Sequence, residues 1–177
     1  KYIGELMLQD YASAYGMSSI SFRYFNACGA DPDGELGQIK NATHLIARIM
    51  ESVTLGTEFS VYGNDYDTPD GTCIRDYTHV EDIARAHVQG IEYMINNAGA
   101  HAFNLGSGSG SSVMEIIQAT KDALDIDVEY SISDRRSGDP DCVYADITQA
   151  TQQLGWTPKH KLNDIVSHAY NWYTSTT

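Results

Sequence analysis

The sequence alternates between segments with a strand pattern and segments with a helical pattern along its whole length. Strand-like segments are rich in aromatic and β-branched residues or alternate between apolar and polar ones, and they cover residues 18–26, 59–62, 102–105 and 128–132. Apolar residues recur at helical spacing over residues 2–11, 43–53, 81–96, 112–124, 147–154 and 162–173. This alternation predicts an α/β fold, and neither an internal repeat nor a low-complexity linker divides the chain.

The charge balance limits which partners the protein binds. The 177 residues include 11 Lys and Arg against 24 Asp and Glu, so the formal net charge is −13. We therefore expect no nucleic-acid partner and no anionic membrane partner, and an anionic ligand needs arginines placed close to it. The three scattered cysteines, Cys28, Cys73 and Cys142, fit reduced thiols and a cytoplasmic location.

A glycine-rich segment, residues 106–112, lies between a predicted strand and a predicted helix, where phosphate-binding loops occur. Its spacing departs from the dinucleotide fingerprint, since Gly110 comes one residue too early, and no Lys-Ser or Lys-Thr follows to make a P-loop. Serines that enter a helix also cap its free N–H groups. We therefore interpret the segment as a structural helix cap.

Histidines give no metal signal. His79 and His87 are eight residues apart and could share a helix face, but no carboxylate or cysteine completes a ligand set around them. We expect no metal site.

The arginines and one tyrosine indicate a binding site. Arg75 follows a long polar loop, and Arg136 lies in a turn that contains Gly138. Arginine forks match phosphate oxygens, and the ring of Tyr62, at a strand end, could cover a flat base. Surface ion pairs with the many carboxylates explain the same arginines. The residues alone therefore indicate an anion site in loops beyond strand ends and leave the ion-pair alternative open.

Five motifs together resemble a known family. They are Arg-Tyr-Phe-Asn-Ala-Cys-Gly-Ala (23–30), the segment from Tyr62 to Val80 with its long loop before Arg-Asp, Phe-Asn-Leu-Gly (103–106), Arg-Arg-Ser-Gly-Asp (135–139) and Leu-Gly-Trp (154–156). In order and spacing they resemble the nucleotide-sugar epimerases of the extended short-chain dehydrogenase/reductase superfamily, and the long loop resembles members that act on carbon 4 of UDP-hexoses. The resemblance covers essentially the whole chain. It implies the C-terminal part of an extended Rossmann-type fold, mainly the nucleotide-sugar-binding domain.

The start of the chain fits the same resemblance. Family members carry a Tyr-x-x-x-Lys pair with a Glu four residues after the lysine, and Lys1 and Glu5 have this spacing. The resemblance implies that residues 1–177 form the substrate-binding portion with the last strands and helices of the NAD-binding domain. It places the catalytic tyrosine and the dinucleotide loop before Lys1, so we expect this chain by itself to be inactive.

The implied reaction is the NAD-dependent interconversion of UDP-glucose and UDP-galactose by a homodimeric enzyme. Other nucleotide-sugar epimerases, acting on UDP-uronates or UDP-pentoses, and a non-catalytic nucleotide-sugar-binding module are the alternatives. The resemblance implies that Lys1 is catalytic and holds the nicotinamide ribose, and that Tyr24 and Phe25 contact the cofactor.

The resemblance also implies a set of substrate-binding residues: Asn26, Asn41, Ala42, Leu45, Ser60, Val61, Tyr62, Arg75, Arg136, Asp139 and Val143. The two arginines would bind the diphosphate, Asp139 a hydroxyl, and Leu45 with residues 60–62 the uracil. Asn26 as a turn residue and Asn41 as a helix cap remain alternatives. Val143 stands where some members have Tyr, and its small side chain implies room for an N-acetyl group, hence activity on UDP-N-acetylhexosamines.

Overall fold

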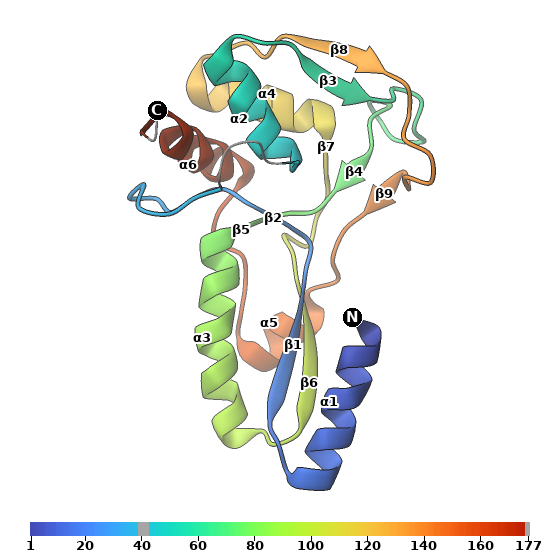
Figure 1. The fold of residues 1–177 in the computed structure, drawn as a ribbon, viewed down its shortest axis with the longest axis vertical. Helices are drawn as coiled ribbons and strands as arrows, with labels where there is room; N and C mark the ends of the chain where they lie inside the picture. The colour runs from blue at the N-terminus through green and yellow to red at the C-terminus, as the bar shows by residue number, and fades with distance from the viewer. Residues whose placement is uncertain (39–42, 176–177) are drawn as a thin grey trace.

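A computed structural model describes residues 1–38 and 43–175. The chain builds an elongated molecule in which a lower part contains α1, β1, β6, α3 and α5, and an upper part contains α2, α4, α6, β3 and β8 (Figure 1). The helices are α1 (Tyr2–Tyr15), α2 (Leu45–Leu55), α3 (Val80–Asn96), α4 (Val113–Leu124), α5 (Thr148–Leu154) and α6 (Leu162–Ser175). The strands are β1 (Ser19–Tyr24), β2 (Asn26–Cys28), β3 (Phe59–Tyr62), β4 (Ile74–Arg75), β5 (Tyr77–His79), β6 (Ala100–Leu105), β7 (Ser111–Ser112), β8 (Tyr130–Ser133) and β9 (Cys142–Val143).

The lower part is organised by the parallel pair β1 and β6, in register from Ser19 opposite Ala100 to Tyr24 opposite Leu105. Successive side chains of a strand point to opposite faces. Accordingly, Arg23 donates to Glu5 of α1 over 2.8 Å, whereas the Tyr24 hydroxyl lies 3.1 Å from His87 Nε2 of α3. The two helices therefore cover opposite faces of this pair.

The upper part has the larger core. It buries apolar side chains of α2, α4 and α6 together with β3, among them Ile49, Met50, Val61, Ile116 and Val166. Strand β3 pairs in parallel with β8 above these helices. A second, smaller core lies against β6 in the lower part and includes Phe103, Leu105 and the fully buried Trp156.

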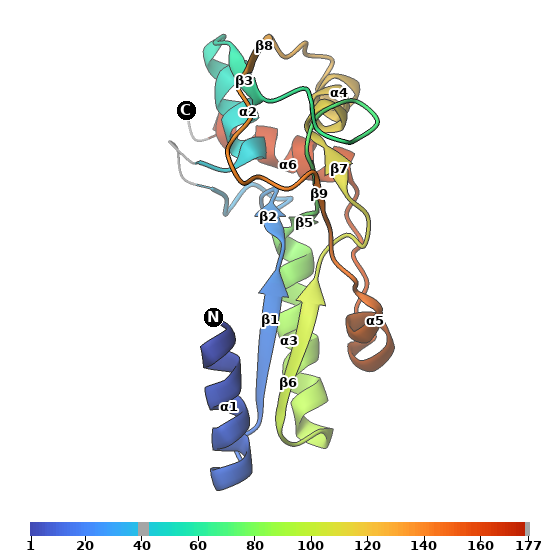
Figure 2. The ribbon, with the colours of Figure 1, turned by 90° about the vertical axis from the view of Figure 1, so that its right-hand side faces the viewer.

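Short strands connect the two parts (Figure 2). Strand β2 pairs in parallel with β5, which runs directly into α3. Strand β4 lies between β7, its antiparallel neighbour, and β9, its parallel neighbour. These strands lie where the two parts meet, and they carry Arg75 and Val143.

The glycine-rich segment binds a carboxylate of the chain itself. Buried Asp76 accepts hydrogen bonds from the backbone N–H of Ser107 (2.6 Å), Gly108 (3.3 Å) and Ala145 (3.0 Å). At the end of the segment, Ser112 caps α4: its Oγ accepts from Glu115 N, and the Glu115 carboxylate accepts from Ser112 N. The structural interpretation of this segment is confirmed, and Asp76 takes the N–H groups that a phosphate would need.

Most predicted elements form, with shifted ends. The strand expected over 18–26 divides at Phe25 into β1 and β2, because the chain changes partner there from β6 to β5. The helix expected from Thr43 begins at Leu45 with His44 as its N-cap, so the prediction of Asn41 as the cap is wrong. Asn41 itself, like Ala42, lies outside the described residues.

The two-residue strands β4, β7 and β9 were not predicted, since pairing with distant segments and not a local pattern creates them. Among the described helices, none combines the length and the apolar character needed to cross a lipid bilayer.

Candidate nucleotide-binding site

A small cavity of about 80 Å³ opens between the start of α2, strand β3 and the turn before β9. Six of its lining residues were predicted from the sequence: Leu45, Ser60, Val61, Tyr62, Arg136 and Asp139. Five were not: Thr43, Arg48, Phe59, Cys73 and Val113. The fold therefore brings these six predicted substrate-binding residues together around one cavity.

Arg75 lies beside this cavity in an ion pair. Its Nη2 donates to Asp139 Oδ1 over 2.7 Å, and its Nη1 donates to the carbonyl of Ile74 over 2.7 Å. The Tyr66 hydroxyl donates to the other carboxylate oxygen of Asp139 over 3.4 Å. Val143 of β9 lies opposite Arg75 of β4 in the register of these two parallel strands. In this structure, therefore, Arg75 forms an ion pair with a carboxylate, which was the alternative to anion binding.

Tyr62 lies close to two guanidinium groups, those of Arg136 and Arg48. The Cζ of Arg136 lies 4.1 Å from the centre of the Tyr62 ring, in a cation–π contact. The pKa of the Tyr62 phenol is lowered below its usual value, mainly by interaction with the Arg136 guanidinium and secondly by interaction with that of Arg48. The guanidinium of Arg136 therefore occupies one face of the Tyr62 ring, which the sequence indicated could cover a flat base.

The N-terminus of α2 faces the same cavity, because Leu45, its first residue, lines it. The N-cap His44 makes no side-chain hydrogen bond to the helix, and no acidic residue lies in the first turn. Free N–H groups at a helix N-terminus carry partial positive charge and attract anions. With the arginines beside it, this edge of the cavity suits a phosphate group.

The residues predicted for the cofactor lie lower in the molecule. Lys1 is the N-cap of α1 and lies near the carboxyl end of β1 (Figure 2), the edge at which α/β folds bind dinucleotides. Phe25 N donates to the Leu105 carbonyl over 3.2 Å, and Asn26 N donates to the Asp76 carbonyl over 3.0 Å. Tyr24 is half-exposed and points toward α3. The chemical character of these side chains, one cation and two aromatic rings, suits the negative charge and the flat ring of a nicotinamide dinucleotide.

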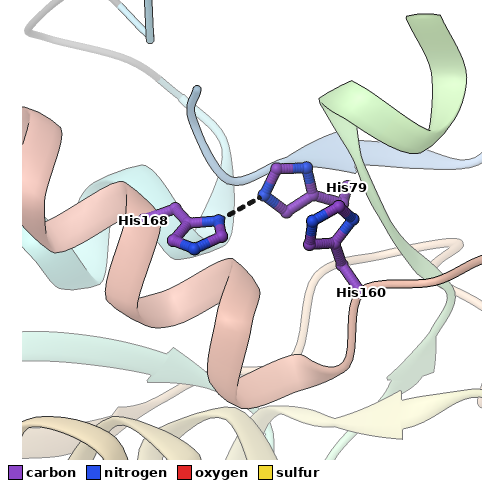
Figure 3. A group of neighbouring side chains, drawn as sticks. All are labelled: His79, His160 and His168. Atoms are coloured by element: carbon purple, nitrogen blue, oxygen red, sulfur yellow. Dashed lines mark hydrogen bonds between the residues drawn. The ribbon is translucent and has the colours of Figure 1, made fainter. Parts of the chain in front are cut away.

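Three histidines form a cluster that the sequence analysis did not predict (Figure 3). One ring nitrogen each of His79, His160 and His168 lies within 4.8 Å of the others, and His79 Nε2 is 3.0 Å from His168 Nδ1. His87, which the sequence paired with His79, instead bonds to Tyr24 and to the carbonyl of Ile83.

The bonding of this cluster does not match a metal site. His79 Nδ1 accepts a hydrogen bond from Glu81 N, so in the neutral ring Nε2 carries the proton and has no lone pair for a metal. The His160 ring stacks on the His79 ring, with centres 4.0 Å apart and planes 23° from parallel. Two stacked rings cannot aim their in-plane lone pairs at one ion. We interpret the cluster as a hydrogen-bonded junction of α3, α6 and the segment before α6.

A larger cavity of about 610 Å³ lies between β2, α2, α3 and α6. Among the described residues that line it there is no predicted site residue, no arginine and no lysine. The described lining therefore offers no arginine or lysine to an anionic ligand, in contrast to the smaller cavity.

Comparison with known proteins identifies the class of protein. Residues 1–106 match the model of the NAD dependent epimerase/dehydratase family. The chain belongs to this family, and the resemblance found in its motifs is confirmed.

The relatives are more particular than the family. The UDP-glucose 4-epimerase of Azospirillum brasilense is 42% identical over 179 residues, covering 99% of this chain and 51% of that protein. Among solved structures, UDP-glucose 4-epimerase from Brucella ovis in complex with NAD is 44% identical with a TM-score of 0.90, covering 97% of this chain and 54% of that one. The enzyme from Stenotrophomonas maltophila, with bound NAD and formylated UDP-arabinopyranose, is 32% identical with a TM-score of 0.94, covering 99% and 53%. The chain spans about half the length of the curated relatives that it matches.

Proposed function

We propose that the full-length protein is an NAD-dependent UDP-glucose 4-epimerase that interconverts UDP-glucose and UDP-galactose. Residues 1–177 would supply its substrate-binding portion and the last strands and helices of its NAD-binding domain. The observation that supports this most directly is the cavity at the start of α2, around which six predicted substrate-binding residues gather. The names of the relatives support the same activity.

The contacts suggest which part of the substrate each residue would bind. Arg75 and Arg136 would bind the diphosphate, and Asp139, which already accepts from Arg75 and Tyr66, would accept a hydroxyl of the substrate. The uracil would lie against Leu45 and residues 60–62. Asn26 would add a hydrogen bond from the lower part of the molecule, and we assign the same role to Asn41 and Ala42.

On the cofactor side, we assign Lys1, Tyr24 and Phe25. Bound NAD would supply the hydride acceptor for the oxidation at carbon 4 and the hydride donor for the reduction on the opposite face. Lys1 would hold the nicotinamide ribose, and its charge would favour the ionised form of a neighbouring tyrosine hydroxyl. Phe25 would lie against the flat ring.

Titration calorimetry with UDP and UDP-glucose tests the binding site. We expect micromolar binding that falls at least tenfold in Arg136→Ala, because a charge-assisted hydrogen bond is lost. Lys121→Ala is the matched control, since Lys121 forms an exposed ion pair with Asp127 and is not among the described residues that line the cavity. Equal affinity in Arg136→Ala and the native protein would contradict the assigned site.

An epimerase assay tests the activity. We expect UDP-galactose formation from UDP-glucose by the full-length gene product and none by residues 1–177 alone, because Lys1 needs its tyrosine partner. Turnover of UDP-uronates or UDP-pentoses in preference to UDP-glucose would support those alternative activities. Binding without turnover of any of these substrates by the full-length protein would support the non-catalytic module.

We propose that UDP-N-acetylhexosamines are also substrates. Val143 is small and partly exposed, opposite Arg75 in the pairing of β9 with β4, and such a side chain would leave room for an N-acetyl group. A UDP-Glc/GlcNAc 4-epimerase from Campylobacter jejuni is 35% identical to this chain with a TM-score of 0.79. Val143→Tyr should lower turnover of UDP-GlcNAc and spare UDP-glucose; no native turnover of UDP-GlcNAc would contradict the proposal.

We further propose a cytoplasmic homodimer. Helix α1 has exposed apolar side chains, including Tyr2, Ile3, Met7 and Tyr15, which a second copy could bury. Light scattering of the full-length protein measures the assembly, and a monomeric mass would refute it.

A further inference from the structure

The arginines of this acidic chain are used unequally. Four of them form ion pairs with carboxylates: Arg23 with Glu5, Arg75 with Asp139, Arg85 with Asp82, and Arg135 with Asp141. Within residues 1–38 and 43–175, neither Arg48 nor Arg136 has a carboxylate oxygen within 4.0 Å. With 24 acidic residues for 11 basic ones, an arginine that lacks such a partner is unusual in this protein.

These two arginines line the same cavity. Arg48, Arg136 and Tyr62 all line it, and the Arg136 guanidinium stacks on the Tyr62 ring. Both arginines lower the pKa of the Tyr62 phenol, so both guanidinium charges lie close to it. Two positive charges that share one neutral phenol repel each other, and an anion between them would remove that repulsion. The cavity therefore concentrates positive charge that no side chain of the described structure neutralises.

The position of Arg48 on α2 points in the same direction. Arg48 is three residues after Leu45, so both lie on the helix face that lines the cavity, whereas Ile49 and Met50 are buried in the core. Its backbone N–H donates to the carbonyl of His44, the N-cap, over 3.0 Å, which places it in the first turn.

A cation in a first helical turn is electrostatically unfavourable. The longer helices α1, α3, α4 and α6 each have an acidic residue in this turn, and α2 has none. A bound anion would reverse the unfavourable charge at this helix end.

We propose that Arg48 is a third arginine of the nucleotide site and binds a phosphate group of a nucleoside diphosphate at the start of α2. The assignment rests on the proposed function, since it takes the cavity as the nucleotide site, and it adds a residue that the motifs did not indicate. Arg136 leaves Tyr62 to bind the same diphosphate. Arg48 adds a positive charge that no described carboxylate pairs with, whereas the charge of Arg75 is shared with Asp139. Arg48 recognises the phosphates and not the base.

Calorimetry on the full-length protein with UDP and with uridine separates these roles. Arg48→Met keeps the length of the side chain and removes its charge, and Arg48→Lys keeps the charge without the fork. We expect Arg48→Met to weaken UDP binding at least tenfold and uridine binding less than twofold, with Arg48→Lys in between. The affinity of the native protein for UDP should also fall more steeply with salt than that of Arg48→Met. Lys121→Met is the charge-matched control and should bind UDP as the native protein does.

Three results would overturn the proposal. The first is native affinity for UDP in Arg48→Met, and the second is an equal loss for UDP and uridine, which indicates a change in cavity shape. The third is a salt dependence that Arg48→Met leaves unchanged. Failure of the proposed function looks different: the native protein would not bind UDP, or Arg136→Ala would bind it normally. If Arg48→Met does not fold, weaker UDP binding by Arg48→Lys with unchanged uridine binding supports the proposal, and native affinity for UDP in Arg48→Lys refutes it.

Discussion

His79 should make the stability of this protein depend on pH between 6.5 and 4. Its side chain is 1% exposed. Burial, and then repulsion from His160 and His168, lowers its pKa from 6.5 to about 4, although Asp82 and Asp164 act in the opposite direction. In the unfolded chain the ring takes up a proton near pH 6.5, whereas the folded protein resists it until about pH 4. The unfolded state therefore binds more protons in this window, and stability falls as the pH decreases through it.

The size of the effect follows from the two values. At about 1.4 kcal/mol for each pH unit between them, His79 accounts for about 3 kcal/mol over the whole window and for about 2 kcal/mol between pH 6.5 and 5. His79 Nδ1 also accepts from Glu81 N at the start of α3, so protonation removes the helix cap. The loss is a considerable part of the stability of a typical domain.

His79→Asn isolates this contribution. Asparagine caps helices well and does not titrate, while His160, His168, Glu81 and Asp82 remain in place. Urea unfolding at pH 7.5 and at pH 5 should show that the variant loses about 2 kcal/mol less than the native protein over this interval. His101→Asn is the control, because His101 lies on β6 against Tyr93 and Phe103, away from the cluster. If His79→Asn loses as much stability as the native protein, the reasoning is wrong.

Two further substitutions test the packing around Gly106 and around Trp156. Gly106→Ala would place its Cβ 2.4 Å from both Asp76 Oδ2 and Ala145 Cβ, so we expect a loss of more than about 2 kcal/mol in urea unfolding. Gly4→Ala, in α1 with nothing within 4 Å, should instead leave stability unchanged or raise it by up to about 1 kcal/mol; similar effects at the two sites would contradict the contact. Trp156→Phe removes the bond from the buried indole N–H to the Asp82 carbonyl (2.8 Å), which should lower the free energy of unfolding by about 1–3 kcal/mol. An unchanged urea midpoint in Trp156→Phe would show that this bond does not stabilise the fold.

The residues of the candidate site differ in whether the sequence could predict them. Tyr62 and Arg136 belong to motifs, so a resemblance was enough to select them, and they line one cavity. Arg48 carries no motif and lies in a helix, where a charged residue normally indicates a solvent-facing position. Only its place beside Tyr62 indicates a role in binding. A helix cap such as Ser112, in contrast, depends on residues three positions apart and was predictable from the sequence.

The sequence by itself determined the α/β class, the order of the longer elements, the helix cap at Ser112 and the family. These features depend on local periodicity, on neighbouring residues or on motifs, all of which a single chain displays without folding. The tertiary structure decided which charges are paired and which are not. Arg75 meets Asp139 across 64 residues, and His79 meets His168 across 89. No local pattern encodes such contacts, because they form only when β4 pairs with β9 and α6 packs against β5, which brings distant segments together.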